Sequence, residues 1–186
     1  MRSGLLLCIA LMLPLAATAP ARAAGSNGSK SVETAGTAVA IALPLIAAGL
    51  TVEKHDWKGT AQLGVETLLT VGTAYALKQF VRERRPDGSD YQSFPSDTTA
   101  VAASGAAFLW GRYGWEYGVP AFAATEFVAY SRVQARQHHW YDTFASDAIA
   151  AGYGYLLTTP FKRRYNVNTS LDASPGGAYL HVSYDF

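Results

Sequence analysis

Cysteine is nearly absent from this 186-residue chain, because the one cysteine, Cys8, lies in the amino-terminal leader. The leader, residues 1–23, joins the basic Arg2 to an apolar run and ends in Ala21-Arg22-Ala23, which is the pattern of a secretory signal peptide. We expect cleavage after Ala23. The mature chain would then have neither a disulfide nor a thiol nucleophile, so its stability must come from packing.

An excess of basic charge is also missing. Lys and Arg number 15 against 14 Asp and Glu, and loss of Arg2 and Arg22 with the leader lowers the first number to 13, for a mature net charge near −1. This balance argues against a nucleic-acid partner. The chain also lacks a Gly-x-Ser-x-Gly turn, a Walker-type loop and a dinucleotide fingerprint, so the enzyme classes built on those motifs have no support.

Strand signals are few before residue 162, where apolar periodicity predicts helices. We therefore predict an all-α bundle at residues 35–162, with five helices, or six if the leader is retained. The first segment, 35–52, is apolar and contains Pro44, which suits either a short membrane span or a kinked buried helix. The Gly/Ser-rich lead-in at 24–34 is expected to be flexible. The five helices are predicted at 35–52, 57–80, 98–110, 119–134 and 141–158.

The tail at residues 163–186 has a different pattern. Apolar and polar residues alternate on both sides of Pro175-Gly176-Gly177, which predicts a β-hairpin. A membrane barrel needs about eight strands, so two cannot close one. We expect the hairpin to pack on the helical domain.

Polar residues in the run SRVQARQHHWYD form the first candidate site. Ser131-Arg132 supplies an anion-binding group, His138 is a candidate nucleophile, and Asp142 is a candidate orienting carboxylate one helical turn further on. A helix that serves only for packing needs none of these groups. Phosphoryl chemistry is therefore the first hypothesis.

Two further segments supply groups that bind anions. In KQFVRERRP, Lys78 and Arg85 are seven residues apart, so we expect both on one face of a helix that Pro86 then ends. In SFPSDTTA, Ser96 precedes a helix that begins near Thr98. Free amides at a helix start, together with a serine hydroxyl, make a good phosphate cradle.

Each of these groups also has a plainer interpretation. The cations of residues 78–85 could be a solvated basic helix end, and Ser96 could be an ordinary cap, which is compatible with phosphate binding. His138, His139 and Asp142 are residue types that bind metals, but no further His or Cys lies nearby to complete a site. We therefore expect no metal.

In order and spacing, the three segments resemble the type 2 phosphatidic acid phosphatase superfamily, which includes vanadium haloperoxidases and bacterial acid phosphatases. Its pattern is Lys-x6-Arg-Pro, Pro-Ser-Gly-His and Ser-Arg-x5-His-x3-Asp, and this chain shows Lys78–Pro86, Pro95–Thr98 and Ser131–Asp142. The resemblance implies a phosphatase in which His138 forms a phosphohistidine and Asp142 holds its other ring nitrogen. It implies a phosphate cradle that needs no metal or cofactor. The implied cradle residues are Lys78, Arg85, Ser96, Ser131 and Arg132.

The second segment departs from the family pattern. Asp97-Thr98 stands where the family has Gly-His, whose histidine protonates the leaving oxygen. A threonine hydroxyl is far too weak an acid, and a carboxylate at a helix start is stabilised in its charged form. General acid catalysis is typically worth about 100- to 10,000-fold, so we expect a preference for diphosphates, whose leaving group is itself a phosphate. His139 or His55 is the alternative proton source.

The leader and the resemblance together imply an exported envelope protein that is periplasmic or membrane-associated, with its active site facing the periplasm. Its expected partner is a phosphorylated lipid, such as phosphatidate, a polyprenyl diphosphate or lipid A, or a small phosphate ester. The alternative function is a catalytically impaired protein of the same fold that only binds anions or interacts with the envelope.

Overall fold

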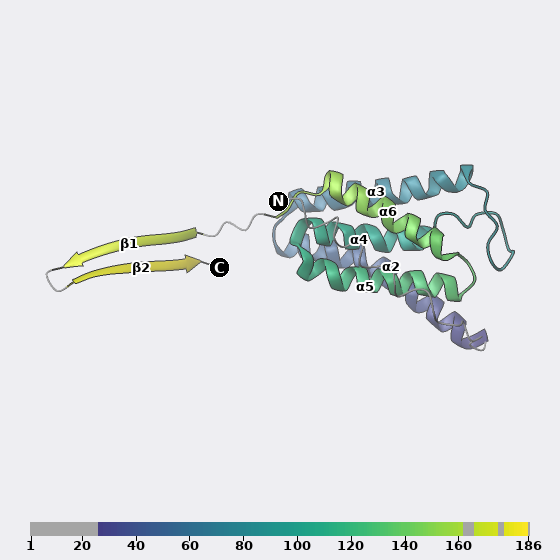
Figure 1. Cartoon of the computed structure of the whole chain (residues 1–186), viewed down its shortest axis with the longest axis horizontal. Helices are drawn as coiled ribbons and strands as arrows, with labels where there is room; N and C mark the ends of the chain where they lie inside the picture. The colour runs from purple at the N-terminus through teal and green to yellow at the C-terminus, as the bar shows by residue number, and fades with distance from the viewer. Residues whose placement is uncertain (1–25, 162–165, 175–176, 186) are drawn as a thin grey trace.

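The computed structural model describes residues 26–161, 166–174 and 177–185 (Figure 1). The predicted leader lies outside these residues. The first described range contains five helices, which confirms the all-α bundle. These are α2 (Ser26–Glu53), α3 (Trp57–Phe80), α4 (Asp97–Tyr113), α5 (Trp115–Gln134) and α6 (Trp140–Leu157).

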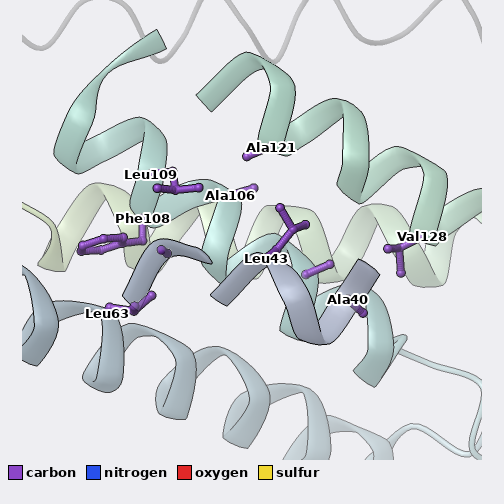
Figure 2. Packing of buried hydrophobic residues seen from close by; sticks show 10 residues of the cluster. Ala40, Leu43, Leu63, Ala106, Phe108, Leu109, Ala121 and Val128 are labelled. Atoms are coloured by element: carbon purple, nitrogen blue, oxygen red, sulfur yellow. The ribbon is translucent and has the colours of Figure 1, made fainter. Parts of the chain in front are cut away.

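Helix α4 is the centre of the bundle and contacts each of the other four helices. Its alanines keep its surface narrow, and Phe108 of α4, Leu43 of α2 and Val128 of α5 are buried around them (Figure 2). A Cβ atom at Gly105 would lie 2.8 Å from the backbone nitrogen of Pro44, so only glycine allows this approach of α4 to α2. Small residues therefore set the close spacing of the core helices.

The structure differs from the sequence patterns at two places. The lead-in at 24–34 is helical from Ser26, because Glu33 in the second turn of α2 accepts hydrogen bonds from Arg132 and Gln137. Helix α3 has the predicted range 57–80, but it does not run on to Pro86, so Lys78 and Arg85 do not share one helix face. Beyond it the chain is extended, and Glu83 pairs with residues 92–93 through a β-bridge and a 3.0 Å bond from the Ser93 amide.

The carboxyl-terminal strands β1 (Asn166–Ser174) and β2 (Gly177–Asp185) pair antiparallel, with Leu171 opposite Leu180. Among the described residues, these strands contact each other and no helix. The expected packing of the hairpin on the bundle is therefore not seen there.

Candidate active site

The three sequence motifs meet at one end of the bundle, where α3 and α5 end and α4 and α6 begin (Figure 1). The segment between α3 and α4 is tied to the segment between α5 and α6. The amide of Asp87 donates to the carbonyl of Arg136 at 2.9 Å, and the amide of Ser96 donates to the carbonyl of Asp142 at 3.2 Å. These bonds join the first two motifs to the third.

His138 is buried in the turn before α6, and its ring is held from one side. Its Nδ1 lies 2.7 Å from the carbonyl oxygen of Ser93 and 3.5 Å from Oδ2 of Asp142. A carbonyl oxygen can only accept, so Nδ1 carries the proton and the lone pair of the neutral ring lies on Nε2. Nε2 is therefore the ring nitrogen that can act as a base or a nucleophile.

Asp142 is fully buried one helical turn beyond His138. Its Oδ2 accepts hydrogen bonds from the Ser93 hydroxyl at 2.5 Å and from the His139 amide at 2.8 Å. Burial alone would raise the pKa of this carboxyl, but the contact with His138 and the hydrogen bonds from Ser93 and the His139 amide outweigh burial and hold the pKa below its usual value. Asp142 is thus a fixed negative charge beside the ring.

The two cations of the first motif come from different elements, Lys78 from a helix and Arg85 from a loop. Lys78 is buried in the last turn of α3 and donates to the carbonyls of Gln92 at 2.8 Å and Pro95 at 2.9 Å. Arg85 extends from the loop, where its Nε donates to Asp90 at 2.8 Å. The other guanidinium nitrogens of Arg85 have no hydrogen-bond partner among the described residues, so they are available to an anion.

Ser96 is the amino-terminal cap of α4 and is fully buried. Its hydroxyl accepts from the Thr99 amide at 3.3 Å and lies 3.0 Å from the Thr99 hydroxyl. The capping prediction is confirmed. Asp97 and Thr98 follow as the first helical residues, whose amides have no partner within the helix and point out of its positive end.

The anion binders of the third motif are turned toward α2. The Ser131 hydroxyl donates to the Val128 carbonyl at 2.6 Å. Arg132 is buried, and each of its guanidinium nitrogens already has an acceptor, including the Glu33 carbonyl and the Thr37 hydroxyl of α2. Four of the five N–H groups of this guanidinium are therefore already used, and only one N–H of Nη1 has no hydrogen-bond acceptor among the described residues.

Asp97, in the position of the family's acid motif, pairs with a cation. Its Oδ2 lies 3.2 Å from Nζ of Lys78, and its side chain is 47% exposed. Asp97 therefore already neutralises the charge of Lys78, while Thr98 offers only a hydroxyl. This pairing argues against Asp97 as a proton donor.

Removal of the Asp97 charge is expected to strengthen anion binding. In Asp97→Asn, inorganic phosphate should inhibit about 2- to 5-fold more tightly, since a partly exposed ion pair is worth at most about 1 kcal/mol. Inhibition constants measured at fixed ionic strength test this. Asp87→Asn, an exposed loop acid that does not pair with Lys78, is the matched control. Equal or weaker inhibition of Asp97→Asn would contradict the assignment.

The two alternative proton sources are placed differently. His139 lies at the site, 34% exposed, with Nδ1 3.5 Å from Asp142 and 3.9 Å from Glu83, and its ring is stacked on Tyr141 at a centroid distance of 4.9 Å. His55 lies in the turn between α2 and α3, where α4 ends rather than begins. The structure therefore brings His139, and not His55, to the motif residues.

Glu83, His139 and Asp142 bring ligand-type atoms within 4.8 Å of one another. Tyr141 donates to Glu83, and Asp142 accepts from the Ser93 hydroxyl and the His139 amide. This hydrogen-bond network explains the cluster without an ion.

Two residues at the site were missed by sequence reasoning. Ser93 contacts both His138 and Asp142, and its only signal is its place two residues before Pro95 of the second motif. Glu33 engages Arg132 from a segment that composition assigned to a flexible lead-in. No sequence pattern links either residue to the histidine motif.

Fold and site together define a helical bundle in which a buried histidine, cationic side chains and the start of a helix meet at one end. No protein-family model matches the chain. The chain is 30% identical over 131 residues to the lipid A 4'-phosphatase of Helicobacter pylori strain J99, which covers 64% of this chain and 66% of that protein. The crystal structure of Aquifex aeolicus LpxE superposes with a TM-score of 0.61 at 19% identity, over 72% of this chain and 87% of that one.

With its three ordered motifs, the chain belongs to the type 2 phosphatidic acid phosphatase superfamily.

Proposed function

We propose that this protein is a phosphatase of phosphorylated envelope lipids that acts through a phosphohistidine intermediate. The observation that carries this proposal is the geometry of His138, whose Nδ1 is held by Ser93 and Asp142 while the lone pair of Nε2 remains for attack. The resemblance to a lipid A 4'-phosphatase supports a lipid carrying phosphate as the substrate class.

The reaction has two displacements. Nε2 of His138 forms a bond to phosphorus as the bond from phosphorus to the leaving oxygen breaks. The oxygen of a water molecule then forms a bond to phosphorus as the bond from phosphorus to Nε2 breaks. The water gives up a proton to the solvent, inorganic phosphate is released and the ring becomes neutral again. Lys78, Arg85 and the free amides of α4 stabilise the negative charge of the equatorial oxygens, and Asp142 stabilises the positive ring.

The leaving group determines which substrates react well. No histidine stands at position 98, so a leaving oxygen that needs protonation departs slowly, whereas a phosphate leaves without an added proton. The preferred substrate is therefore a lipid diphosphate. A panel of purified lipid monophosphates and diphosphates tests this, and equal turnover of the two classes would remove the proposed preference.

Restoring the family's acid motif is expected to broaden the substrate range. In the double variant Asp97→Gly/Thr98→His, hydrolysis of an alkyl monophosphate should rise about 100-fold, and hydrolysis of a diphosphate should change far less. The ratio of kcat/KM for the two substrates is the measurement. Asp97→Gly alone is the control for the lost carboxylate. A uniform change for both substrates would show that position 98 does not act on the leaving group.

A second candidate function is anion binding without turnover. It is favoured by the two ion pairs that occupy phosphate-binding cations, Lys78 with Asp97 and Arg132 with Glu33. Purified protein that binds inorganic phosphate but hydrolyses neither class of lipid would support it.

The lipid substrate suggests a membrane location. One helical stretch of the described residues, Gly28–Glu53, is long and apolar enough to cross a membrane. Its outer side chains Ile41, Leu45 and Ile46 are more than half exposed in the isolated chain. Our proposal therefore includes contact between α2 and lipid, which flotation of the protein with liposomes tests. It also includes an active site that faces the periplasm, which the accessibility of the site to a membrane-impermeant reagent tests.

A further inference from the structure

We propose that Ser93 is the positioning residue of this active site, with its carbonyl fixing the tautomer of His138 and its hydroxyl fixing Asp142. The inference rests on the proposed function and deepens it, because it assigns to a backbone carbonyl the direct hold on the nucleophile that the resemblance gives to Asp142.

The distances around the ring rank the two acceptors. The Ser93 carbonyl lies 2.7 Å from Nδ1 of His138, within the range of a normal hydrogen bond, whereas Asp142 lies at 3.5 Å. Asp142 therefore acts on the ring through its charge. The tautomer that leaves Nε2 unprotonated is set by Ser93.

The hydroxyl of Ser93 holds the Asp142 carboxylate in position. It donates to Asp142 Oδ2 at 2.5 Å, and the His139 amide donates to the same oxygen at 2.8 Å. The other candidate acceptor for the Ser93 hydroxyl, Nδ1 of His139, lies farther away, at 3.5 Å. Among the described residues, the Asp142 carboxylate is therefore the nearest acceptor. Loss of the hydroxyl would leave a buried carboxylate with one fixed donor fewer and freedom to turn.

The backbone around Ser93 is anchored on both sides. Lys78 donates to the carbonyls of Gln92 and Pro95, which flank Ser93, and the Ser93 amide donates to the carbonyl of Glu83 at 3.0 Å. Ser93 itself is fully buried. Its carbonyl and hydroxyl are therefore held in place before substrate binds, which is what preorganisation of a nucleophile requires.

The same contacts suit the phosphohistidine. When Nε2 bonds to phosphorus, the ring becomes positively charged and keeps its Nδ1 proton. The hydrogen bond to the Ser93 carbonyl then becomes charge-assisted, and Asp142 balances the ring charge. No proton has to move at Nδ1 in either displacement.

Variants at Ser93 test the role of the hydroxyl. Ser93→Ala should lower kcat for a lipid diphosphate about 10- to 100-fold, the range expected for a lost hydrogen bond to a charged group, with KM changed less than about 2-fold. Ser93→Thr, which keeps a hydroxyl, should recover a larger part of kcat than Ser93→Ala. The matched control is Ser104→Ala, a fully buried serine in α4 that bonds to Thr67 and Val101.

A purely structural role would show a different pattern. The positioning role of the hydroxyl is overturned if Ser93→Ala and Ser104→Ala lower both the thermal midpoint and kcat to the same extent. It is also overturned if the loss of activity in Ser93→Ala is a rise in KM rather than a fall in kcat. Full activity of Ser93→Ala in an enzyme that requires His138 would overturn it as well, and would leave the proposed function standing.

The role of the carbonyl is tested without turnover. In protein labelled with ¹⁵N-histidine, the neutral ring of His138 should carry its proton on Nδ1, and it should still do so in Asp142→Ala, because Ser93 remains. A shift of that proton to Nε2 in Asp142→Ala would overturn the role of the carbonyl. This readout stands even if the wild-type protein hydrolyses no lipid phosphate, an outcome that would refute the proposed function instead.

Discussion

His138→Ala is expected to abolish phosphate hydrolysis, with a fall in kcat of at least about 10,000-fold, as for removal of other covalent nucleophiles. In the proposed mechanism Nε2 of His138 forms the bond to phosphorus, and alanine removes this atom without changing Lys78 and Arg85, the proposed phosphate-binding cations. Binding of inorganic phosphate should therefore change little. Steady-state hydrolysis of a lipid diphosphate, together with a phosphate-binding titration on the same preparation, measures the two effects.

Other histidines provide the controls. His55→Ala changes an exposed residue in the turn between α2 and α3 and should keep wild-type activity. His139→Ala tests the second proton source: if its ring protonates the leaving oxygen, monophosphate hydrolysis falls and diphosphate hydrolysis is spared. Residual hydrolysis near the wild-type level in His138→Ala would exclude the phosphohistidine mechanism. Acid-labile phosphate trapped on Nε2 of His138 would support it.

The largest effect on stability is expected at the other end of the bundle, where Asp56 and Arg112 form a buried ion pair. Arg112 Nε donates to Asp56 Oδ2 at 2.6 Å, Asp56 also caps α3 through the Gly59 amide, and the Tyr113 hydroxyl donates to the same carboxylate. Arg112→Met leaves a buried carboxylate without its cation. Removal of one partner of such a pair costs about 3–5 kcal/mol, a drop in thermal midpoint on the order of 10 °C.

A double variant separates the ion pair from simple packing. Asp56→Leu/Arg112→Met leaves no buried charge and should regain part of the lost stability, whereas Lys58→Ala, at an exposed neighbouring position, should change the unfolding free energy by less than about 0.5 kcal/mol. Thermal or denaturant unfolding followed by circular dichroism measures all three variants. A single Arg112→Met variant as stable as the wild type would show that the pair contributes nothing.

The same pair predicts a pH dependence. Burial would raise the pKa of Asp56, but the hydrogen bonds from Arg112, the Gly59 amide and Tyr113 outweigh it and hold the pKa below its usual value. The folded state therefore releases this proton more readily than the unfolded state, in which the pKa of Asp is about 3.9. Its contribution to stability is present above that pH and is lost as pH falls through the lowered folded value. Arg112→Met should lose this part of the acid dependence.

Local patterns predicted the helices well. The bounds of α3, Trp57–Phe80, agree with the predicted range, because Asp56 caps its start and an apolar run fills its length. The pattern failed where a tertiary contact replaced a local one. Residues 81–85 continue the helical spacing, yet they are not helical, because Glu83 pairs with residues 92–93 and the Arg85 amide donates to the carbonyl of Asp90. A partner ten residues away leaves no mark on the periodicity of the segment itself.

The site was predictable as a set of residue types but not as a set of contacts. Motif spacing identified His138 and Asp142, and the structure places Nδ1 of the first 3.5 Å from Oδ2 of the second. It could not show that Ser93 contacts both residues, because every residue has a backbone carbonyl and the sequence does not indicate which one meets the histidine. Nor could it show that Arg132 is bound by Glu33, since that contact spans 99 positions along the chain. Patterns report which side chains are present, and only the folded backbone determines what each one touches.

The bond between His138 and Ser93 joins positions 45 residues apart in the chain. The turn that carries the histidine can form early, from neighbouring residues of α5 and α6, but the carbonyl that sets its tautomer arrives only when the loop before α4 has docked. A partly folded chain that leaves this loop undocked would therefore contain the whole nucleophile motif with a histidine of no fixed tautomer. The histidine motif thus depends on a contact that is distant along the chain and that exists only when the bundle is closed.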